Sequence, residues 1–147
     1  MSTTPTLSTQ LIGQTEKTLN AILDRLLADT GLTEPQWVTL TVAVMGGGTI
    51  DLPEFVIRVA DALKISEAEA RTRIAELAAA QLFEMPDLDA SPVRVTDAGR
   101  QLHGRIRCVV VEITDRMWGD LPPGDLAAAG RVLTTVLERA NAELART

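Results

Sequence analysis

Apolar residues recur at intervals of three and four along most of the chain, the spacing that places them on one face of an α-helix. Glycine- or proline-containing segments interrupt the pattern and mark the turns between helices. The pattern predicts helices that run from residue 8 to 30, 33 to 45, 51 to 64, 66 to about 80, 96 to 118 and 125 to the end.

Polar residues that favour helix N-termini stand at the start of these stretches. In three cases a Glu or Gln follows three positions later, which is the pattern of a capping box. The predicted pairs are Thr33 with Gln36, Asp51 with Glu54, and Ser66 with Glu69, and single caps are expected at Thr96 and Asp125. Only Lys64 and Ile65 then separate the third and fourth helices, which is the layout of a helix-turn-helix.

Two short apolar runs follow the fourth helix, Leu82–Met85 and Val93–Val95, and they are expected to pair as a β-hairpin. The fold class predicted from this order is mostly α with a small β-hairpin wing, a winged helix-turn-helix domain over residues 31–99. Residues 1–7 are expected to be a flexible tail. The apolar stripes of residues 8–30 and 100–147 have two interpretations: they pack on the central domain, or they form a helical dimerisation region.

Composition and charge limit the classes of function that the chain can have. The chain of 147 residues carries 14 Lys and Arg against 20 Asp and Glu, a net charge of −6, which opposes non-specific attraction to nucleic acid. A single histidine and a single cysteine give neither a metal site nor an internal disulfide, and Cys108 is expected to be a buried packing residue. No catalytic constellation, cofactor motif, signal peptide or membrane span is evident, so we expect a cytoplasmic protein that is not an enzyme and needs no cofactor.

Four segments, taken in order and spacing, resemble the MarR family of transcriptional regulators. They are Leu32–Leu40 (LTEPQWVTL), Leu63–Ser66 (LKIS) with Ile74 and Leu77 after it, Val95–Arg100 (VTDAGR, similar to the family's LT-x-x-G-R), and Val132–Arg139 (VLTTVLER). The resemblance implies a homodimer joined through the terminal helices, which favours the dimerisation interpretation. It also implies a fourth helix in the DNA major groove, a wing near the minor groove, and a ligand-responsive regulator, most simply a repressor.

The resemblance places the DNA-binding residues on the fourth helix and the wing: Ser66, Arg71, Thr72, Arg73 and Arg94. This chain departs from the family there. Residues 51–100 hold six Lys and Arg against ten Asp and Glu, a net of −4, and the segment Pro86–Pro92 has two Asp and no Arg. Phosphate neutralisation normally supplies much of the affinity for DNA. Two hypotheses follow: operator binding through a few arginines, or a winged-helix dimer with weak or lost DNA binding that serves as a protein-interaction or ligand-binding module.

A candidate ligand site combines Trp37 with three residues of the fifth helix. Arg100, His103 and Arg107 stand at i, i+3 and i+7 and so share one face. They would draw a small anionic or aromatic ligand into the cleft beside Trp37, or they form an exposed face paired with nearby carboxylates.

Overall fold

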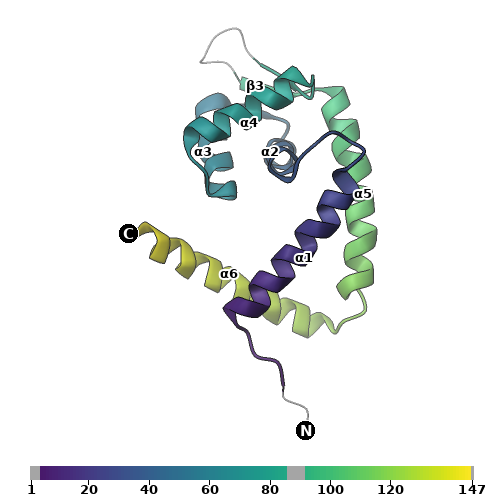
Figure 1. Ribbon diagram of the computed structural model, residues 1–147, viewed down its shortest axis with the longest axis vertical. Helices are drawn as coiled ribbons and strands as arrows, with labels where there is room; N and C mark the ends of the chain where they lie inside the picture. Colours follow the sequence, from purple (N-terminus) through teal and green to yellow (C-terminus); the bar gives the residue numbers. More distant parts are fainter. Residues whose placement is uncertain (1–3, 86–91, 147) are drawn as a thin grey trace. The chain divides into compact units, whose positions relative to one another are not determined.

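The structure, a computed structural model, describes residues 4–85 and 92–146. The contacts within the chain divide it into two compact units, residues 1–108 and 109–147. In chain order the elements are α1 (Thr9–Leu27), α2 (Glu34–Met45), β1 (Thr49–Asp51), α3 (Leu52–Leu63), α4 (Glu67–Ala79), β2 (Phe83–Glu84), β3 (Pro92–Val95), α5 (Asp97–Trp118) and α6 (Pro123–Ala145) (Figure 1). The predicted fold class, mostly α with a small sheet, is confirmed.

Local sequence sets most of the helix starts in the first unit. Ser8 caps α1 by accepting a hydrogen bond from Leu11 N. Ser66 caps α4 by accepting one from Glu69 N, at 3.1 Å. The Thr96 hydroxyl accepts one from Gly99 N, at 3.0 Å, at the start of α5. The caps at Ser66 and Thr96 were predicted and are confirmed, because each depends only on residues within one turn of the helix. The cap at Ser8 was not predicted.

Two predicted caps are wrong. Asp51 precedes α3 but its side chain makes no capping hydrogen bond, and Glu54 pairs with Arg58 at 2.8 Å instead. Helix α6 begins at Pro123 with Pro122 as its N-cap, so Asp125 lies in the first turn of the helix. Proline suits the first turn because its φ is already helical and its missing N–H would have no partner there.

The sheet has three antiparallel strands among the described residues, in the order β1-β3-β2, where a two-stranded hairpin was predicted. Strand β1 adds a third member by pairing Ile50 with Val93. On the other side of β3, Glu84 lies opposite Arg94. The two valines of β3 are buried while Arg94 between them is exposed, the alternation of a strand with one face on a core. The predicted wing loop is Pro86–Pro92; its residues 86–91 lie outside the described residues, and Pro92 begins β3.

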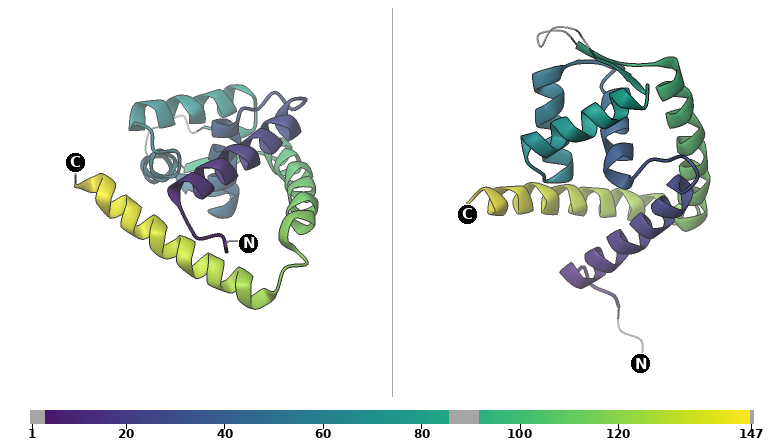
Figure 2. Two further views of the ribbon diagram at one scale, coloured as in Figure 1. Left: turned by 60° about the horizontal axis from the view of Figure 1, so that its bottom comes forward. Right: turned by 45° about the horizontal axis from the view of Figure 1, so that its top comes forward.

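The hydrophobic core joins α2, α3 and α4 to the strands, which lie at one end of this helix group in Figure 1 and in the right-hand view of Figure 2. Phe55 of α3 and Phe83 of β2 meet edge to face, with ring centroids 5.4 Å apart. The turn between α3 and α4 spans residues 64–66 and contains one left-handed residue, Lys64, at φ 56°. This tight connection fixes the direction of α4, with Ala70, Ile74 and Leu77 buried.

Gly99 allows α5 to start against the sheet. A Cβ at this position would stand 2.5 Å from the carbonyl oxygen of Leu82 and 2.9 Å from Cγ1 of Val95. Both distances are shorter than any real carbon contact, so only glycine fits. The close approach therefore anchors the first turn of α5 to β2 and β3.

The second unit contains the end of α5 and α6. Helix α6 has no buried residue within the described chain. Four of its large apolar side chains are exposed: Val132, Leu133, Leu137 and Leu144. No described helix is both long enough and apolar enough to cross a membrane.

Candidate nucleic-acid interface and ligand groove

Helix α4 presents a face of small side chains to the outside of the first unit. A helix advances 100° per residue, so the direction opposite the buried Ala70, Ile74 and Leu77 is that of Ala68, Thr72 and Ala75. All three of these outward residues are exposed. Thr72 donates its hydroxyl hydrogen to the carbonyl of Ala68, at 3.1 Å. Small outward side chains let the backbone of α4 approach another molecule closely.

The two arginines of α4 stand in different surroundings. Arg71 is exposed and makes no ion pair with the part of the chain that the structure describes. Arg73 is half-buried, and its Nε lies 2.9 Å from Oε1 of Glu76. The same Glu76 oxygen accepts a hydrogen bond from Nε2 of Gln36 on α2, at 3.2 Å. Both arginines were predicted to bind DNA, whereas in the structure Arg71 is exposed and Arg73 is paired.

Arg94 of β3 is paired across the sheet. Its Nη2 lies 2.7 Å from Oε2 of Glu84, the residue opposite it on β2. The two side chains are 59% and 61% exposed, so the pair contributes only about 0.2–1 kcal/mol. A phosphate could therefore compete for Arg94 at small cost.

Ion pairs of this kind occupy four of the six Lys and Arg residues of residues 51–100 and leave the net charge of the segment at −4. Besides Arg73 and Arg94, Arg58 pairs with Glu54 and Lys64 pairs with Asp61. The remaining charges at the N-terminus of α4 are Glu67 and Glu69, both exposed. Acidic side chains stabilise the positive end of a helix dipole, but they also repel a phosphate approaching that end.

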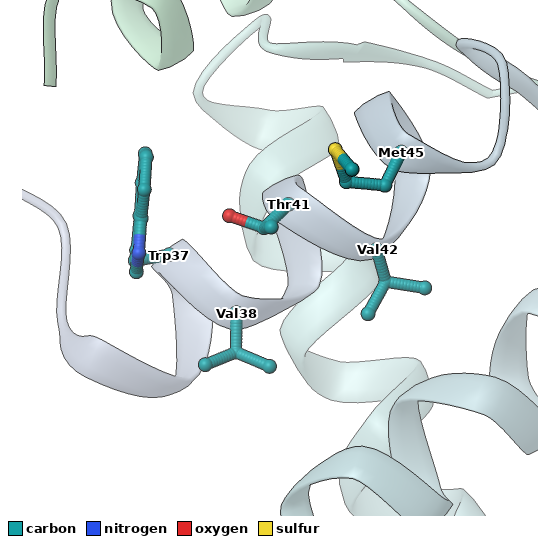
Figure 3. A pocket seen from close by; sticks show the side chains of 5 residues that line it. All are labelled: Trp37, Val38, Thr41, Val42 and Met45. Atoms are coloured by element: carbon teal, nitrogen blue, oxygen red, sulfur yellow. The ribbon is translucent and has the colours of Figure 1, made fainter. Parts of the chain in front are cut away.

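A groove of about 240 Å³ runs along α2 and is lined by Trp37, Val38, Thr41, Val42 and Met45 (Figure 3). The buried Oγ1 of Thr41 has no hydrogen-bond partner within the described residues, and in Figure 3 it points to the Trp37 end of the groove. Such an unpaired hydroxyl costs about 1–3 kcal/mol. The groove is therefore lined by apolar side chains, apart from the Thr41 hydroxyl, which has no hydrogen-bond partner among the described residues.

Trp37 and His103 stack with ring centroids 4.8 Å apart and ring planes 16° apart. His103 is 4% exposed, and its Nε2 is buried without a partner among the described residues. Burial, with a smaller contribution from the positive charge of Arg107, lowers the pKa of His103 below its usual value. The imidazole is therefore neutral at physiological pH, and one face of the Trp37 ring is covered.

Of the four predicted ligand residues, Trp37 lines the groove, and His103, Arg100 and Arg107 do not. Arg100 lies against the backbone at Gly48, where its Nη2 is 2.8 Å from the place a Cβ would take. Gly48 has φ +85°, a conformation that glycine alone adopts readily. Arg107 is exposed one turn beyond His103.

Sequence reasoning missed Thr41 and Met45, although both follow Trp37 at intervals of four and so share its face of α2. It was wrong about Cys108, which is exposed. Helix α5 buries Gly99, His103 and Ile106, and Cys108 lies about 200° around the helix from Ile106. The described residues contain no group of three or more His, Cys, Asp or Glu side chains that could hold a metal ion.

Solved structures similar to this chain are MarR-type regulators. One is a MarR protein from Peptoclostridium difficile, with a TM-score of 0.73, 14% identity, and 97% of each chain covered. Another is BpsR of Bordetella bronchiseptica, whose DNA binding is regulated by 6-hydroxynicotinic acid; the TM-score is 0.68 at 26% identity, with 88% of this chain and 93% of that one covered. A third, from Mycobacterium tuberculosis, is a MarR-family protein in complex with salicylic acid, with a TM-score of 0.60, 21% identity, and coverage of 86% and 94%.

No family model matches the sequence, and the search of curated proteins gives no match. The likeness therefore lies in the three-dimensional fold over nearly the whole chain.

Proposed function

Because the chain is a winged-helix protein of the MarR type, we propose that it is a transcriptional regulator that binds operator DNA as a homodimer and responds to a small ligand. The observation that carries the proposal is the exposed outer face of α4, a helix fixed by the short turn at Lys64 and capped by Ser66. In a helix-turn-helix protein the second helix enters the major groove. Release of DNA on ligand binding, as in a repressor, is the form of regulation we propose.

The proposed DNA contacts come from α4 and the wing. Arg71 and Thr72 reach base edges. Ser66 at the helix N-terminus binds a phosphate oxygen only if its hydroxyl leaves the Glu69 carboxylate, to which it donates at 3.3 Å. Arg94 and Arg73 contribute only if they leave their glutamate partners. This arrangement supports selective binding with few phosphate contacts, in keeping with the acidic surface.

The proposed ligand is a small aromatic molecule in the groove along α2. Trp37 supplies a ring for stacking and Thr41 supplies an unused hydroxyl, while neutral His103 holds Trp37 in place. Arg107 stands close enough to affect His103 electrostatically and is the cation best placed to attract a carboxylate. Arg100 contributes through the Gly48 turn rather than by direct contact.

The homodimer is proposed from the apolar surface of the terminal helices. Leu11 of α1 is 44% exposed, and Leu137 and Leu144 of α6 are 58% and 59% exposed. A surface of this kind is covered in a stable soluble protein. The proposal places the protein in the cytoplasm with its DNA and includes no catalytic activity.

A DNA-binding titration tests the function. Fluorescence anisotropy would be measured with a duplex from the region upstream of the protein's own gene and with a scrambled duplex of the same length. The proposal predicts tighter binding to the upstream duplex, and an affinity that falls when salt rises from about 50 to about 200 mM. If neither duplex binds at low salt, DNA binding is refuted and a ligand- or protein-binding module remains.

Tryptophan fluorescence tests the ligand groove. Trp37 and Trp118 are the only two tryptophans, so a Trp118→Phe variant reports on Trp37 alone. Salicylate and 6-hydroxynicotinate are suitable probes, since similar proteins bind or respond to them. Saturable quenching supports the site, and the absence of any saturable change with either probe contradicts it.

A further inference from the structure

The two arginines of α4 lie on opposite flanks of the helix. Two residues apart corresponds to about 200° around the axis. Arg73 follows Ala70 by three positions and precedes Leu77 by four, so it borders the buried face. Its side chain is 32% exposed. Arg71 lies on the other flank and is exposed.

Glu76 fixes Arg73 to the side of α4 that faces α2. Its Oε1 accepts from Nε2 of Gln36 at 3.2 Å and lies 2.9 Å from Nε of Arg73, an ion pair that lacks the geometry of a hydrogen bond. Gln36 is itself held, because its Oε1 accepts a hydrogen bond from Thr33 N at 3.0 Å in the capping box of α2. One carboxylate therefore ties the guanidinium to a rigid helix start and balances its charge.

Given the DNA-binding function proposed above, we infer that Glu76 is a positioning residue that holds Arg73 against α2 and leaves Arg71 as the arginine of α4 that reads a base. Arginine pairs in bidentate fashion with O6 and N7 of guanine in the major groove, the commonest specific contact. The exposed Ala68, Thr72 and Ala75 beside Arg71 leave room for that approach. The operator thus contains a guanine opposite Arg71 in each half-site.

The arginines provide a matched comparison, because Arg71→Gln and Arg73→Gln remove the same charge two residues apart. Loss of a bidentate base contact lowers the preference for the upstream duplex over the scrambled duplex by about 5- to 150-fold. Arg71→Gln shows that loss. Arg73→Gln leaves the preference within about threefold of the wild-type value, comparable to an ordinary surface substitution.

Glu76→Gln tests the positioning role directly. The amide retains an oxygen for Gln36 but gives up the ion pair, so Arg73 becomes free to contact a phosphate. The plot of log affinity against log salt then becomes steeper by about 0.9, the value of one additional phosphate contact. Combining Glu76→Gln with Arg73→Gln restores the wild-type slope, a result that altered packing alone would not give.

The experiment is an anisotropy titration of the full chain and its four variants against both duplexes over a salt series, with far-UV circular dichroism to confirm folding. The inference is overturned if Arg73→Gln loses as much preference as Arg71→Gln. It is also overturned if Glu76→Gln leaves the salt slope unchanged. Failure of the wild-type protein to bind either duplex refutes the proposed function itself, which distinguishes the two failures.

Discussion

Replacing Thr41 with valine should make the protein more stable. The Thr41 hydroxyl oxygen is buried and has no partner among the described residues, and valine keeps the shape of the side chain while removing that oxygen. The desolvation cost of an unpaired polar group is about 1–3 kcal/mol, and threonine and valine have similar helix propensities. We expect Thr41→Val to raise the free energy of unfolding by about 1–2 kcal/mol.

Thr39→Val is the matched control. Thr39 is fully buried two residues earlier on α2, and its hydroxyl donates to the carbonyl of Pro35 at 2.8 Å. Losing this hydrogen bond should lower the free energy of unfolding by about 0.5–1.5 kcal/mol. Replacing threonine with valine is thus expected to raise the free energy of unfolding at position 41 and to lower it at position 39.

Urea unfolding followed by circular dichroism measures both effects. In thermal unfolding, the shift expected for a chain of this size is about 2–4 °C per kcal/mol. If Thr41→Val destabilises the protein as much as Thr39→Val does, the Thr41 hydroxyl is hydrogen-bonded in the folded protein. The groove would then lack its free polar atom, and the reasoning behind the proposed ligand site would be refuted.

Three further predictions follow from individual contacts. The lowered pKa of His103 means that its stabilising contribution is complete above about pH 6.5 and is lost as the pH falls through the folded-state value. Urea titrations should therefore show a smaller loss of stability on acidification for His103→Phe than for the wild type. Gly99→Ala should cost at least about 2 kcal/mol in the same assay, since its Cβ would meet the Leu82 carbonyl at 2.5 Å; a neutral effect would contradict the close packing. Glu84→Gln frees Arg94 and should tighten non-specific DNA binding in low-salt anisotropy titrations, with stability changed by less than about 1 kcal/mol.

The features predictable from sequence are those determined within one turn of chain. The capping box of Thr33 and Gln36 and the cap at Ser66 form as predicted because donor and acceptor are three residues apart. Strand β1 was not predictable in this way. It is three residues long, and it forms because Ile50 pairs with Val93 of β3, which lies 43 positions later in the sequence.

The candidate site shows the same division. Helical spacing allows the pair of Arg73 with Glu76, three residues on, but the hydrogen bond from Gln36, 40 residues away in sequence, which fixes Glu76, is a tertiary contact. Cys108 was assigned to the core by residue type, whereas the burial of His103 and Ile106 turns it outward. Tertiary contacts determine which arginine is paired and which side of α5 is buried, and these contacts cannot be predicted from a single sequence.

Nuclease footprinting of the DNA upstream of the protein's own gene tests the central claim most directly. A dimeric winged-helix regulator protects two symmetric half-sites whose centres lie about 10 base pairs, or a multiple of that, apart. The account predicts this paired protection, with a guanine in each half-site. The absence of protection at low salt, or uniform protection without half-sites, would contradict it.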